Sequence, residues 1–332
     1  MKTKISLVLL SSIGLILMLT LAPPSTPAAP IELKLVTFLP THVTSVGGAK
    51  AIAAKVKETS KGQLIFKVLG GPEIMSGRDQ PAATVKGVID IAYVPTSYFP
   101  DLVPGLDIIS LSKHRKAADE RKPGGLYDAM QELHNKTGLY FIGRESGINP
   151  DFFYNLLRKP VTKLSDLKGF KIGATIPKYK RSWKALGIAF SVIPAAESYT
   201  AMERGVVDGF NYPIENHVDM GLHEAGKYLL DHGFFCDNVV GIMNLNVWNG
   251  LSPELKKAVI EAQIAVEKDL EAAYSKTVDD SRKKMTAAGV KFIKFSSADA
   301  ARYLDAYYSN ELAEQKAKFP NVAPRLAELL GW

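Results

Sequence analysis

Cys236 is the only cysteine in the 332-residue chain, which excludes an internal disulfide bond. It lies among aromatic residues in GFFCDN, so we expect a small buried side chain there rather than a reactive thiol. Long apolar runs are scarce too: beyond the N-terminal segment, none approaches the roughly 18 residues of a membrane-spanning helix, and we expect a soluble mature protein. The net charge of +7 is small and acids lie between the basic residues, which argues against a nucleic-acid partner.

Motifs of catalysis and metal binding are missing as well. The sequence has no Gly-rich dinucleotide fingerprint, no Walker motif and no G-x-S-x-G nucleophile turn. His217 and His223 do not share a helix face, so they are poor candidates for a joint metal site. Asp90 and Asp208 look like a carboxylate pair, but their identical settings favour structural turn or capping roles. We therefore predict a protein that is not an enzyme, that has no cofactor and in which no metal-ligating residues stand out.

The first 28 residues have the pattern of a secretory signal peptide. Two lysines precede an apolar stretch from Ile5 to Ala22, and small residues at 26–28 offer a cleavage site. We expect an exported mature chain that begins near Ala29. Because the apolar stretch is long for a signal peptide, an uncleaved membrane anchor is the alternative.

One ten-residue sequence pattern, the repeated phrase, occurs twice. KGVIDIAYVP (Lys86–Pro95) returns 118 positions later as RGVVDGFNYP (Arg204–Pro213), with Gly, Asp and Pro in the same places. Each copy follows a helical pattern, so its Gly is placed to end a helix and its β-branched residues to form a buried strand. The spacing exceeds the period of repeat proteins, about 20–50 residues. It predicts two similar lobes that each contain this helix-to-strand joint, with a chance match as the alternative.

Strand-like and helix-like segments alternate through the chain, which is typical of parallel α/β sheets. Ser252-Pro253-Glu254 then marks the start of a long helix, with a capping hydroxyl, a proline in the first turn and an acid. Its apolar stripe continues to Gly289. A helix of about 55 Å is longer than one lobe. It therefore either spans two lobes or breaks near Ser275–Thr277.

Six segments carry a resemblance to a known family. In chain order they are TFLPTH, GGPEIMSGRD, KGVIDIAY, KLSDLKGFKIG, ALGIAFSVIPAAESYTAMERGVVDGFNYP and NVWNGLSPELKKAV. Together they closely resemble the solute-binding subunits of tripartite ATP-independent periplasmic (TRAP) transporters. The resemblance implies a periplasmic-binding-protein-like α/β fold: two α/β lobes around a ligand cleft, with long helices connecting the lobes. Such a protein closes over a small solute in the periplasm and passes it to a permease driven by an ion gradient.

The resemblance also implies a division of the chain. We expect a signal peptide at 1–28, lobe I at 29–149 with 238–277 returning to it, and lobe II at 150–237, with part of 278–332 packed across both lobes. Ligands of open α/β sheets lie beyond the carboxyl ends of the strands, so Tyr93–Thr96 and Phe210–Tyr212 should line the cleft. The predicted ligand-binding residues are Phe38, His42, Pro95, Thr96, Arg144, Phe152, Gly173, Lys178, Asn211 and Tyr212.

At one position the sequence departs from the family. After DLKG-K-I the family usually has an Arg that binds the substrate carboxylate with its planar guanidinium, and this chain has Gly173. A hydrogen bond to a charged group contributes about 1.5–3 kcal/mol, so a carboxylate needs another partner here. Three solutions are open. A cation can substitute, with Arg144, Lys178 and Arg181 as candidates. Backbone N–H groups near Gly173 or a bound metal can hold the acid. Alternatively, the ligand is larger, flatter or uncharged and stacks on aromatic side chains.

The sequence thus predicts an atypical TRAP solute-binding protein for a small organic acid, with aromatic acids as one option. We expect a monomer whose partners are the membrane permease subunits. The same fold can instead present its ligand to a membrane sensor. An ABC-type binding protein is a further alternative, which the motifs around Asp166 and Asp208 disfavour.

Overall fold

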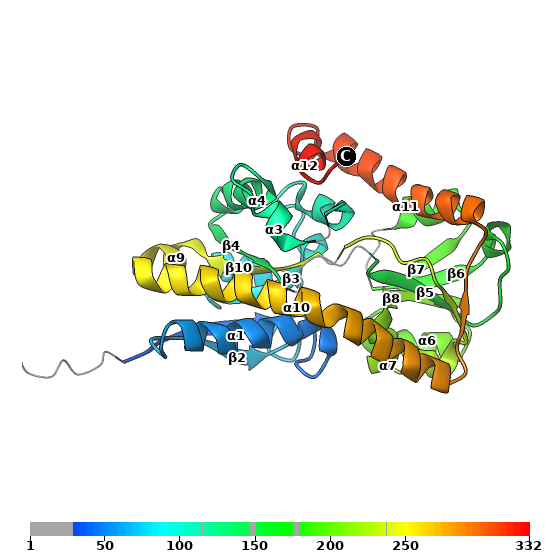
Figure 1. Cartoon of the computed structure of the whole chain (residues 1–332), viewed down its shortest axis with the longest axis horizontal. Helices are drawn as coiled ribbons and strands as arrows, with labels where there is room; N and C mark the ends of the chain where they lie inside the picture. The colour runs from blue at the N-terminus through cyan, green and yellow to red at the C-terminus, as the bar shows by residue number, and fades with distance from the viewer. Residues whose placement is uncertain (1–28, 115, 146–150, 176–178, 237) are drawn as a thin grey trace, which may run out of the picture.

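The strands form two sheets, one in each of two lobes (Figure 1). The computed structural model describes residues 29–332 apart from 115, 146–150, 176–178 and 237, so the predicted signal peptide and Lys178 lie outside the described residues. The sheet of lobe I has the order β2 (Leu64–Gly70), β1 (Ile31–Thr37), β3 (Ile91–Pro95), β10 (Val239–Asn244), β4 (Leu139–Arg144). The sheet of lobe II has the order β11 (Lys291–Ile293), β9 (Tyr228–Leu230), β5 (Phe153–Leu157), β8 (Gly209–Pro213), β6 (Lys171–Ala174), β7 (Ala189–Val192).

The repeated phrase forms the same joint in both lobes. β3 follows α2 (Gln80–Val85) and β8 follows α6 (Ser198–Glu203). Between helix and strand, Gly87 and Gly205 adopt φ angles of 72° and 74°, a left-handed conformation that favours glycine. Each strand has a parallel neighbour on one side and an antiparallel one on the other: β1 and β10 flank β3, and β6 and β5 flank β8. The prediction of two lobes built on one joint is confirmed.

Asp90 and Asp208 hold these joints to the neighbouring parallel strand. The carboxylate of Asp90 accepts the backbone N–H of Lys34 at 2.7 Å, and that of Asp208 accepts the backbone N–H of Lys171 at 3.0 Å. In return, the backbone N–H of each Asp donates to the carbonyl of the same lysine, at 3.1 and 2.7 Å. Each carboxylate thus extends the hydrogen bonding of its sheet at the start of a strand. The structural role predicted for the two acids is confirmed.

Helix α10 (Pro253–Ala287) spans both lobes without a break. The Ser252 hydroxyl caps its first turn by accepting the N–H of Leu255 at 3.3 Å. Its 35 residues pack against α1 (Gly47–Thr59) at the lobe I end and against α7 (Ile214–Asp219) at the lobe II end (Figure 1). Of the two alternatives that the sequence left open, the helix that spans both lobes is therefore confirmed, and a break near Ser275–Thr277 is not found.

A second long helix, α11 (Ser297–Lys318), also bridges the lobes. It contacts α5 (Lys180–Ala185) in lobe II and the short helix η3 (Leu106–Leu111) in lobe I. The other helices are α3 (Ala117–Glu120), α4 (Leu126–Asn135), α8 (Leu222–Ala225), α9 (Leu245–Gly250) and α12 (Ala323–Leu329). We propose the predicted boundaries, 29–149 with 238–277 for lobe I and 150–237 for lobe II, as the division of the chain.

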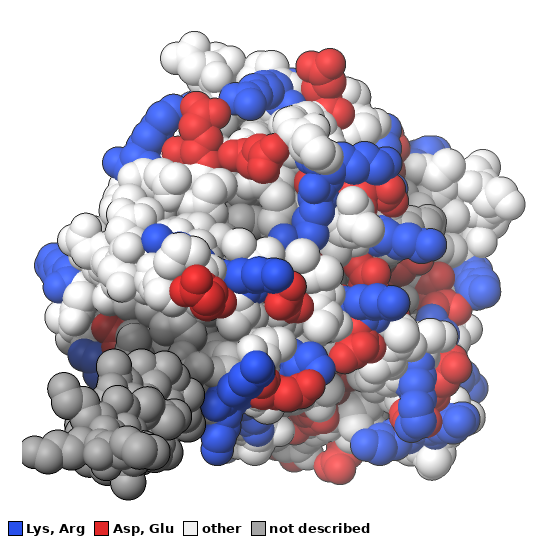
Figure 2. Space-filling model, turned by 60° about the vertical axis from the view of Figure 1, so that its left-hand side comes forward, with Lys and Arg blue, Asp and Glu red and all other residues white. Residues whose placement is uncertain are grey.

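The burial of the cysteine and the mixed surface charges are those of an ordinary globular protein. Cys236 is buried, with Sγ 3.3 Å from the carbonyl oxygen of Ser112. On the face seen in Figure 2, basic and acidic side chains are interspersed. No helix in the described part of the chain combines the length and the hydropathy that crossing a bilayer requires.

Candidate functional site

A cavity of about 470 Å³ lies between the two lobes, where β3, β6 and β8 end. This volume falls within the range of small-molecule sites, about 300–1,000 Å³. Lobe I contributes Phe38, Leu39, Pro40, His42, Val43, Ser45, Pro72, Pro95, Tyr98, Asn238 and Val239. Lobe II contributes Phe152, Phe153, Ala174, Thr175, Tyr179, Pro194, Ala195, Ala196, Asn211, Tyr212, Pro213, Asn216 and Met220.

Aromatic rings and prolines make up a large part of the cavity walls. Its rings are Phe38, Tyr98, Phe152, Phe153, Tyr179 and Tyr212. Several are fixed by one another: Phe38 meets Tyr98 edge-on at 6.1 Å between ring centroids, and Phe152 meets Phe153 edge-on at 5.0 Å. Prolines end the two repeated strands at the cavity, Pro95 in lobe I and Pro213 in lobe II. A wall of this kind favours a ligand with an apolar, flat body.

No Lys, Arg, Asp or Glu of the described residues lines the cavity. Its polar side chains are the imidazole of His42, the hydroxyls of Ser45, Thr175 and the tyrosines, and three carboxamides, which are Asn211, Asn216 and Asn238. Within the described part of the chain, no group of three or more His, Cys, Asp and Glu residues is placed to hold a metal ion. The geometry therefore offers neutral hydrogen-bonding groups in an apolar enclosure.

Two tyrosines that line this space can donate hydrogen bonds through their hydroxyls. Tyr98 comes from η2 (Thr96–Tyr98) in lobe I and Tyr212 from β8 in lobe II. Burial raises the pKa of both phenols, and the nearby Tyr98 adds to the increase at Tyr212. Both therefore keep their proton at neutral pH. Within the described part of the chain neither hydroxyl takes part in a hydrogen bond, so both are available to a ligand.

The lobes touch each other at the rim of the cavity. The Ser45 hydroxyl donates to Asn216 Oδ1 at 2.5 Å, and the backbone N–H of Thr44 donates to Asp219 Oδ2 at 3.0 Å. Ser45 and Thr44 belong to η1 (Thr44–Val46) of lobe I, whereas Asn216 and Asp219 belong to α7 of lobe II. These contacts join the two lobes beside the cavity.

Six of the ten predicted ligand-binding residues line the cavity together: Phe38, His42, Pro95, Phe152, Asn211 and Tyr212. Thr96 is buried beside it and hydrogen-bonds to Asp107 at 2.6 Å instead of facing the space. Within the two repeated segments, Tyr93, Val94 and Phe210 are core residues and do not line it. Lys178 lies outside the described residues.

Gly173 lies in β6 directly before the lining residue Ala174, in a place that has no room for a side chain. A β-carbon at this position would be 2.6 Å from Cδ2 of Phe210 and 3.3 Å from Cδ1 of Ile193. The ring of Phe210 is completely buried and fills the space that a side chain at 173 would need. A side chain at position 173 would therefore require the Phe210 ring to move.

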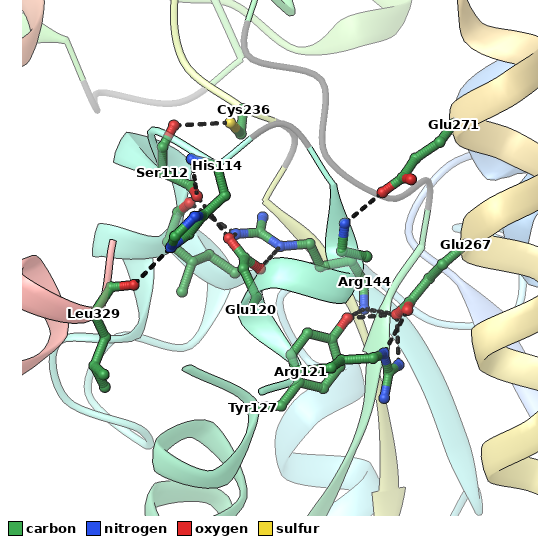
Figure 3. Close-up of polar contacts among 12 residues, drawn as sticks. Ser112, His114, Glu120, Arg121, Tyr127, Arg144, Cys236, Glu267, Glu271 and Leu329 are labelled. Atoms are coloured by element: carbon green, nitrogen blue, oxygen red, sulfur yellow. Dashed lines mark hydrogen bonds and ion pairs between the residues drawn. The ribbon is translucent and has the colours of Figure 1, made fainter. Parts of the chain in front are cut away.

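Arg144 lies away from the cavity, in a buried ion pair of lobe I (Figure 3). Its Nε and Nη2 donate to the two carboxylate oxygens of Glu120 at 2.8 and 2.9 Å. Burial alone would lower the pKa of Arg144, but the charge of Glu120 and its hydrogen bonds raise it overall. Beside this pair, Glu267 of α10 binds Arg121 at 2.6 Å and the Tyr127 hydroxyl. The second candidate cation, Arg181, is exposed and pairs with Glu314 at 3.3 Å.

Several lining residues were not predicted from the sequence: Tyr98, Phe153, Tyr179, Asn216 and Asn238. Tyr98 and Asn216 each follow a repeated phrase by three residues, in the short helix that begins after its proline. The repeat could have predicted both residues, because the residues that follow a strand ending at a cleft also lie at that cleft. Asn238 had no such signal, since its place depends on the antiparallel return of β10 beside β3.

Two α/β lobes with a largely apolar cavity between them, at the carboxyl ends of their central strands, define a two-lobed solute-binding protein. The family of bacterial extracellular solute-binding proteins, family 7, matches residues 35–311, and the chain belongs to this family of TRAP periplasmic solute-binding proteins. The alternative of an ABC-type binding protein is thereby wrong.

Individual relatives are distant in sequence but alike in fold. The monocarboxylate 2-oxoacid-binding periplasmic protein of Nostoc sp. (strain PCC 7120) is 23% identical over 308 residues, which cover 88% of this chain and 82% of that protein. A TRAP periplasmic solute-binding protein from Desulfovibrio salexigens with bound orotic acid has a TM-score of 0.78 and 21% identity, covering 90% of this chain and 97% of that one. An extracytoplasmic solute receptor of Bordetella pertussis that binds pyroglutamic acid has a TM-score of 0.76 and 19% identity, covering 90% and 99%.

Proposed function

We propose that this protein is the periplasmic receptor of a TRAP transporter that captures a small organic acid with a flat or apolar body between its two lobes. The observation that carries the proposal is the cavity of about 470 Å³, walled by six aromatic rings and free of charged side chains among the described residues. After capture, the closed protein delivers the acid to the membrane permease of the transporter.

The relatives support an acid with a compact, flat body. Orotic acid and pyroglutamic acid, bound by two proteins of the same fold, are rings that carry one carboxylate. The curated relative from Nostoc binds monocarboxylate 2-oxoacids. In this chain the rings of Phe38, Phe152 and Tyr212 offer stacking surfaces to such a body, and aromatic stacking contributes about 0.5–1.5 kcal/mol beyond the burial of apolar area.

Neutral donors hold the carboxylate in this proposal. Burial of a carboxylate without partners destabilises the bound complex by several kcal/mol. Each hydrogen bond that the carboxylate accepts stabilises the complex by about 1.5–3 kcal/mol. The phenols of Tyr98 and Tyr212 and the Nδ2 group of Asn216 supply such donors, because the Oδ1 atom of Asn216 already accepts from Ser45. Three donors therefore offset the burial of one negative charge without a cation.

A thermal-shift screen of the mature protein tests this function. The panel contains pyroglutamate, orotate, branched 2-oxoacids and 2-hydroxy acids, aromatic acids, C4-dicarboxylates and sialic acid. We expect the largest stabilisation from a monocarboxylate with a flat or apolar body. Stabilisation by sialic acid or a C4-dicarboxylate above all others would contradict the proposed cavity chemistry. If no acid stabilised the protein, the assignment of an organic acid would be wrong.

Delivery to a permease has a separate test. The purified protein, loaded with the acid that the screen identifies, is added to vesicles that contain the permease subunits encoded beside its gene. We expect ion-gradient-dependent uptake only when this protein is present. If the neighbouring genes encode a membrane sensor and no permease, the receptor serves signalling instead.

A further inference from the structure

Hydrogen bonds fix which end of the Asn211 side chain faces the cavity. Its Nδ2 group donates to the backbone carbonyl of Tyr154 at 3.2 Å and to Oδ1 of Asn155 at 2.9 Å. A backbone carbonyl only accepts hydrogen bonds, so the nitrogen end must point to Tyr154, and both of its protons are used. The side chain lines the cavity, and no donor among the described residues reaches its Oδ1 atom.

The residues behind Asn211 hold this orientation. Asn155 donates its own Nδ2 group to the hydroxyls of Tyr303 at 2.7 Å and Tyr307 at 3.2 Å, so its Oδ1 is left to accept from Asn211. The indole N–H of Trp183 also donates to the Tyr307 hydroxyl, at 2.5 Å. Both tyrosines and the tryptophan are completely buried. Asn211 therefore stands at the cavity end of a buried hydrogen-bond chain that runs back to α11.

The carboxamide of Asn238, in lobe I, is oriented in the same way, with its nitrogen bound to the protein. Its Nδ2 group donates to Oγ1 of Thr96 at 3.1 Å and to the carboxylate oxygen Oδ1 of Asp107 at 2.8 Å. Thr96 donates to the same carboxylate oxygen at 2.6 Å. A carboxylate only accepts, so the nitrogen end of Asn238 must face Asp107. In the described part of the chain, no donor reaches its Oδ1 atom, and the side chain lines the cavity. Thr96 is thus a positioning residue that acts through Asn238.

The cavity consequently presents one amide oxygen from each lobe. Asn216 shows the reverse polarity, because its oxygen is taken by Ser45 and its nitrogen is left to donate. The three carboxamides therefore differ in chemistry although they are the same residue type. Asn216 suits an acid group, whereas a carboxylate or ketone oxygen placed against Asn211 or Asn238 would set acceptor against acceptor.

We infer that the ligand is an acid that also carries an N–H or O–H donor for the amide oxygen of Asn211 or Asn238, as hydroxy acids and lactam or amide acids do. This inference rests on the proposed function and narrows its ligand class. It separates this protein from a receptor for 2-oxoacids, whose ketone oxygen has no proton to donate. A site built to hydrogen-bond a ligand hydroxyl or N–H strongly rejects the analogue that lacks it, since its own polar groups are then left unpaired.

Two pairs of probes of equal charge and nearly equal shape test the inference. One pair is 4-methyl-2-hydroxypentanoate and 4-methyl-2-oxopentanoate; the other is pyroglutamate and its ring-oxygen analogue, the lactone acid. Affinities are measured by calorimetry on the unaltered mature protein. We expect the hydroxy acid and the lactam to bind at least about tenfold more tightly than their partners, because a buried acceptor without a donor loses its hydrogen bonds to water and gains none in the complex.

The outcomes separate the two levels of the proposal. Equal affinities within both pairs, or tighter binding of the 2-oxoacid and the lactone, overturn the donor inference and leave the organic-acid function in place. If neither these probes nor any acid of the wider panel binds, the proposed function itself is wrong, and the inference with it.

Replacement of one amide gives an independent readout. Asn211→Ala removes the acceptor oxygen, so the preference for the hydroxy acid over the 2-oxoacid should fall toward unity, while binding of the carboxylate persists. Asn244→Ala is the matched control: this buried amide hydrogen-bonds to the carbonyls of Thr84 and Val85, caps α9, and does not line the cavity. It should lower stability without altering the preference. A preference that survives in Asn211→Ala contradicts the role of this residue; if that variant does not fold, the probe pairs on the unaltered protein still decide.

Discussion

Arg144 and Glu120 form a two-point ion pair that solvent barely reaches, with only 1% of the arginine side chain and none of the glutamate exposed. The glutamate also accepts a hydrogen bond from Ser112 at 2.6 Å, and the arginine donates to the carbonyl of Ile109 at 3.0 Å (Figure 3). Both charges are therefore satisfied within lobe I. The pair holds α3 and η3 against the end of β4, the last strand before the chain passes to lobe II.

Replacing Arg144 by Met should destabilise the protein by about 3–5 kcal/mol, because Glu120 is left charged and buried without its partner. Urea unfolding at neutral pH measures this loss. The double variant Arg144→Met, Glu120→Met should recover much of the stability, since neither charge remains. The folded fraction of both variants should bind acid normally. Loss of binding with unchanged stability would instead make Arg144 a ligand partner.

Gly173 and Phe210 should behave as one packing unit. The added methyl group of Gly173→Ala meets the Phe210 ring, and overpacking of this kind costs about 1–3 kcal/mol. In a Phe210→Leu background the same substitution should cost less, and a double-mutant cycle measures the coupling. Gly250→Ala is the control, because a β-carbon at Gly250 meets nothing within 4 Å. Equal costs of Gly173→Ala in both backgrounds would show that the ring does not exclude a side chain.

The two-lobed fold could be predicted from the sequence because it depends on short local patterns. The glycine that ends a helix, the buried strand and the aspartate that binds its neighbour form a unit of ten residues, and its repetition predicted both lobes. The start of α10 at Ser252-Pro253 was equally local. Whether α10 is broken near Ser275 could not be predicted from local sequence. The packing of α10 on α1 and α7, which belong to opposite lobes, decides it.

The site was harder to predict because it depends on contacts between distant segments. Arg144 looked available as a cation in sequence, and only the fold brings Glu120 to it, 24 positions earlier in the chain. The polarity of Asn211 and Asn238 depends on Tyr154 and Asp107, which sequence spacing does not place beside them. The sequence thus identified the residue types, whereas the orientation of each side chain and its hydrogen-bond partners could be known only from the structure.

The phenols of Tyr98 and Tyr212 should each contribute to acid binding through their hydroxyls. Tyr98→Phe and Tyr212→Phe should each weaken binding of the best acid from the screen by about tenfold or more, because a hydrogen bond to a charged group is lost while the ring remains. The melting temperature of the unliganded protein should change little, since neither hydroxyl takes part in a hydrogen bond within the described residues. Calorimetry measures the affinities. Tyr199→Phe, outside the cavity, is the control, and an equal effect there would contradict a direct role.

The contact between Ser45 and Asn216 should slow ligand release. Ser45→Ala removes a hydrogen bond between the two lobes, so the dissociation rate should rise by about two- to tenfold, as expected for a neutral hydrogen bond worth about 0.5–1.5 kcal/mol. Stopped-flow displacement measures this rate. Ser309→Ala removes a hydroxyl that binds Asp305 on the surface of α11 and should leave the rate unchanged. If both variants released ligand at the rate of the unaltered protein, the rim contact would have no part in closure.

Acidification should destabilise the protein through two buried histidines. Burial lowers the pKa of His134 and of His217 from 6.5 to about 4, so the unfolded chain binds protons on these rings at a higher pH than the folded chain does. Their contribution to stability is therefore complete above pH 6.5 and is lost as the pH falls toward 4. His134 packs between Phe99 and Phe141 in lobe I, away from the cavity, which makes it the cleaner probe.

In His134→Leu, the loss of unfolding free energy between pH 7 and pH 5 should be smaller than in the unaltered protein by on the order of 2 kcal/mol, because one proton-binding group of the unfolded chain is gone. Urea unfolding at the two pH values measures the difference, and only the change with pH counts, since the substitution also alters packing. An unchanged pH dependence would mean that the imidazole of His134 is protonated in the folded protein as readily as in the unfolded chain, in conflict with its complete burial.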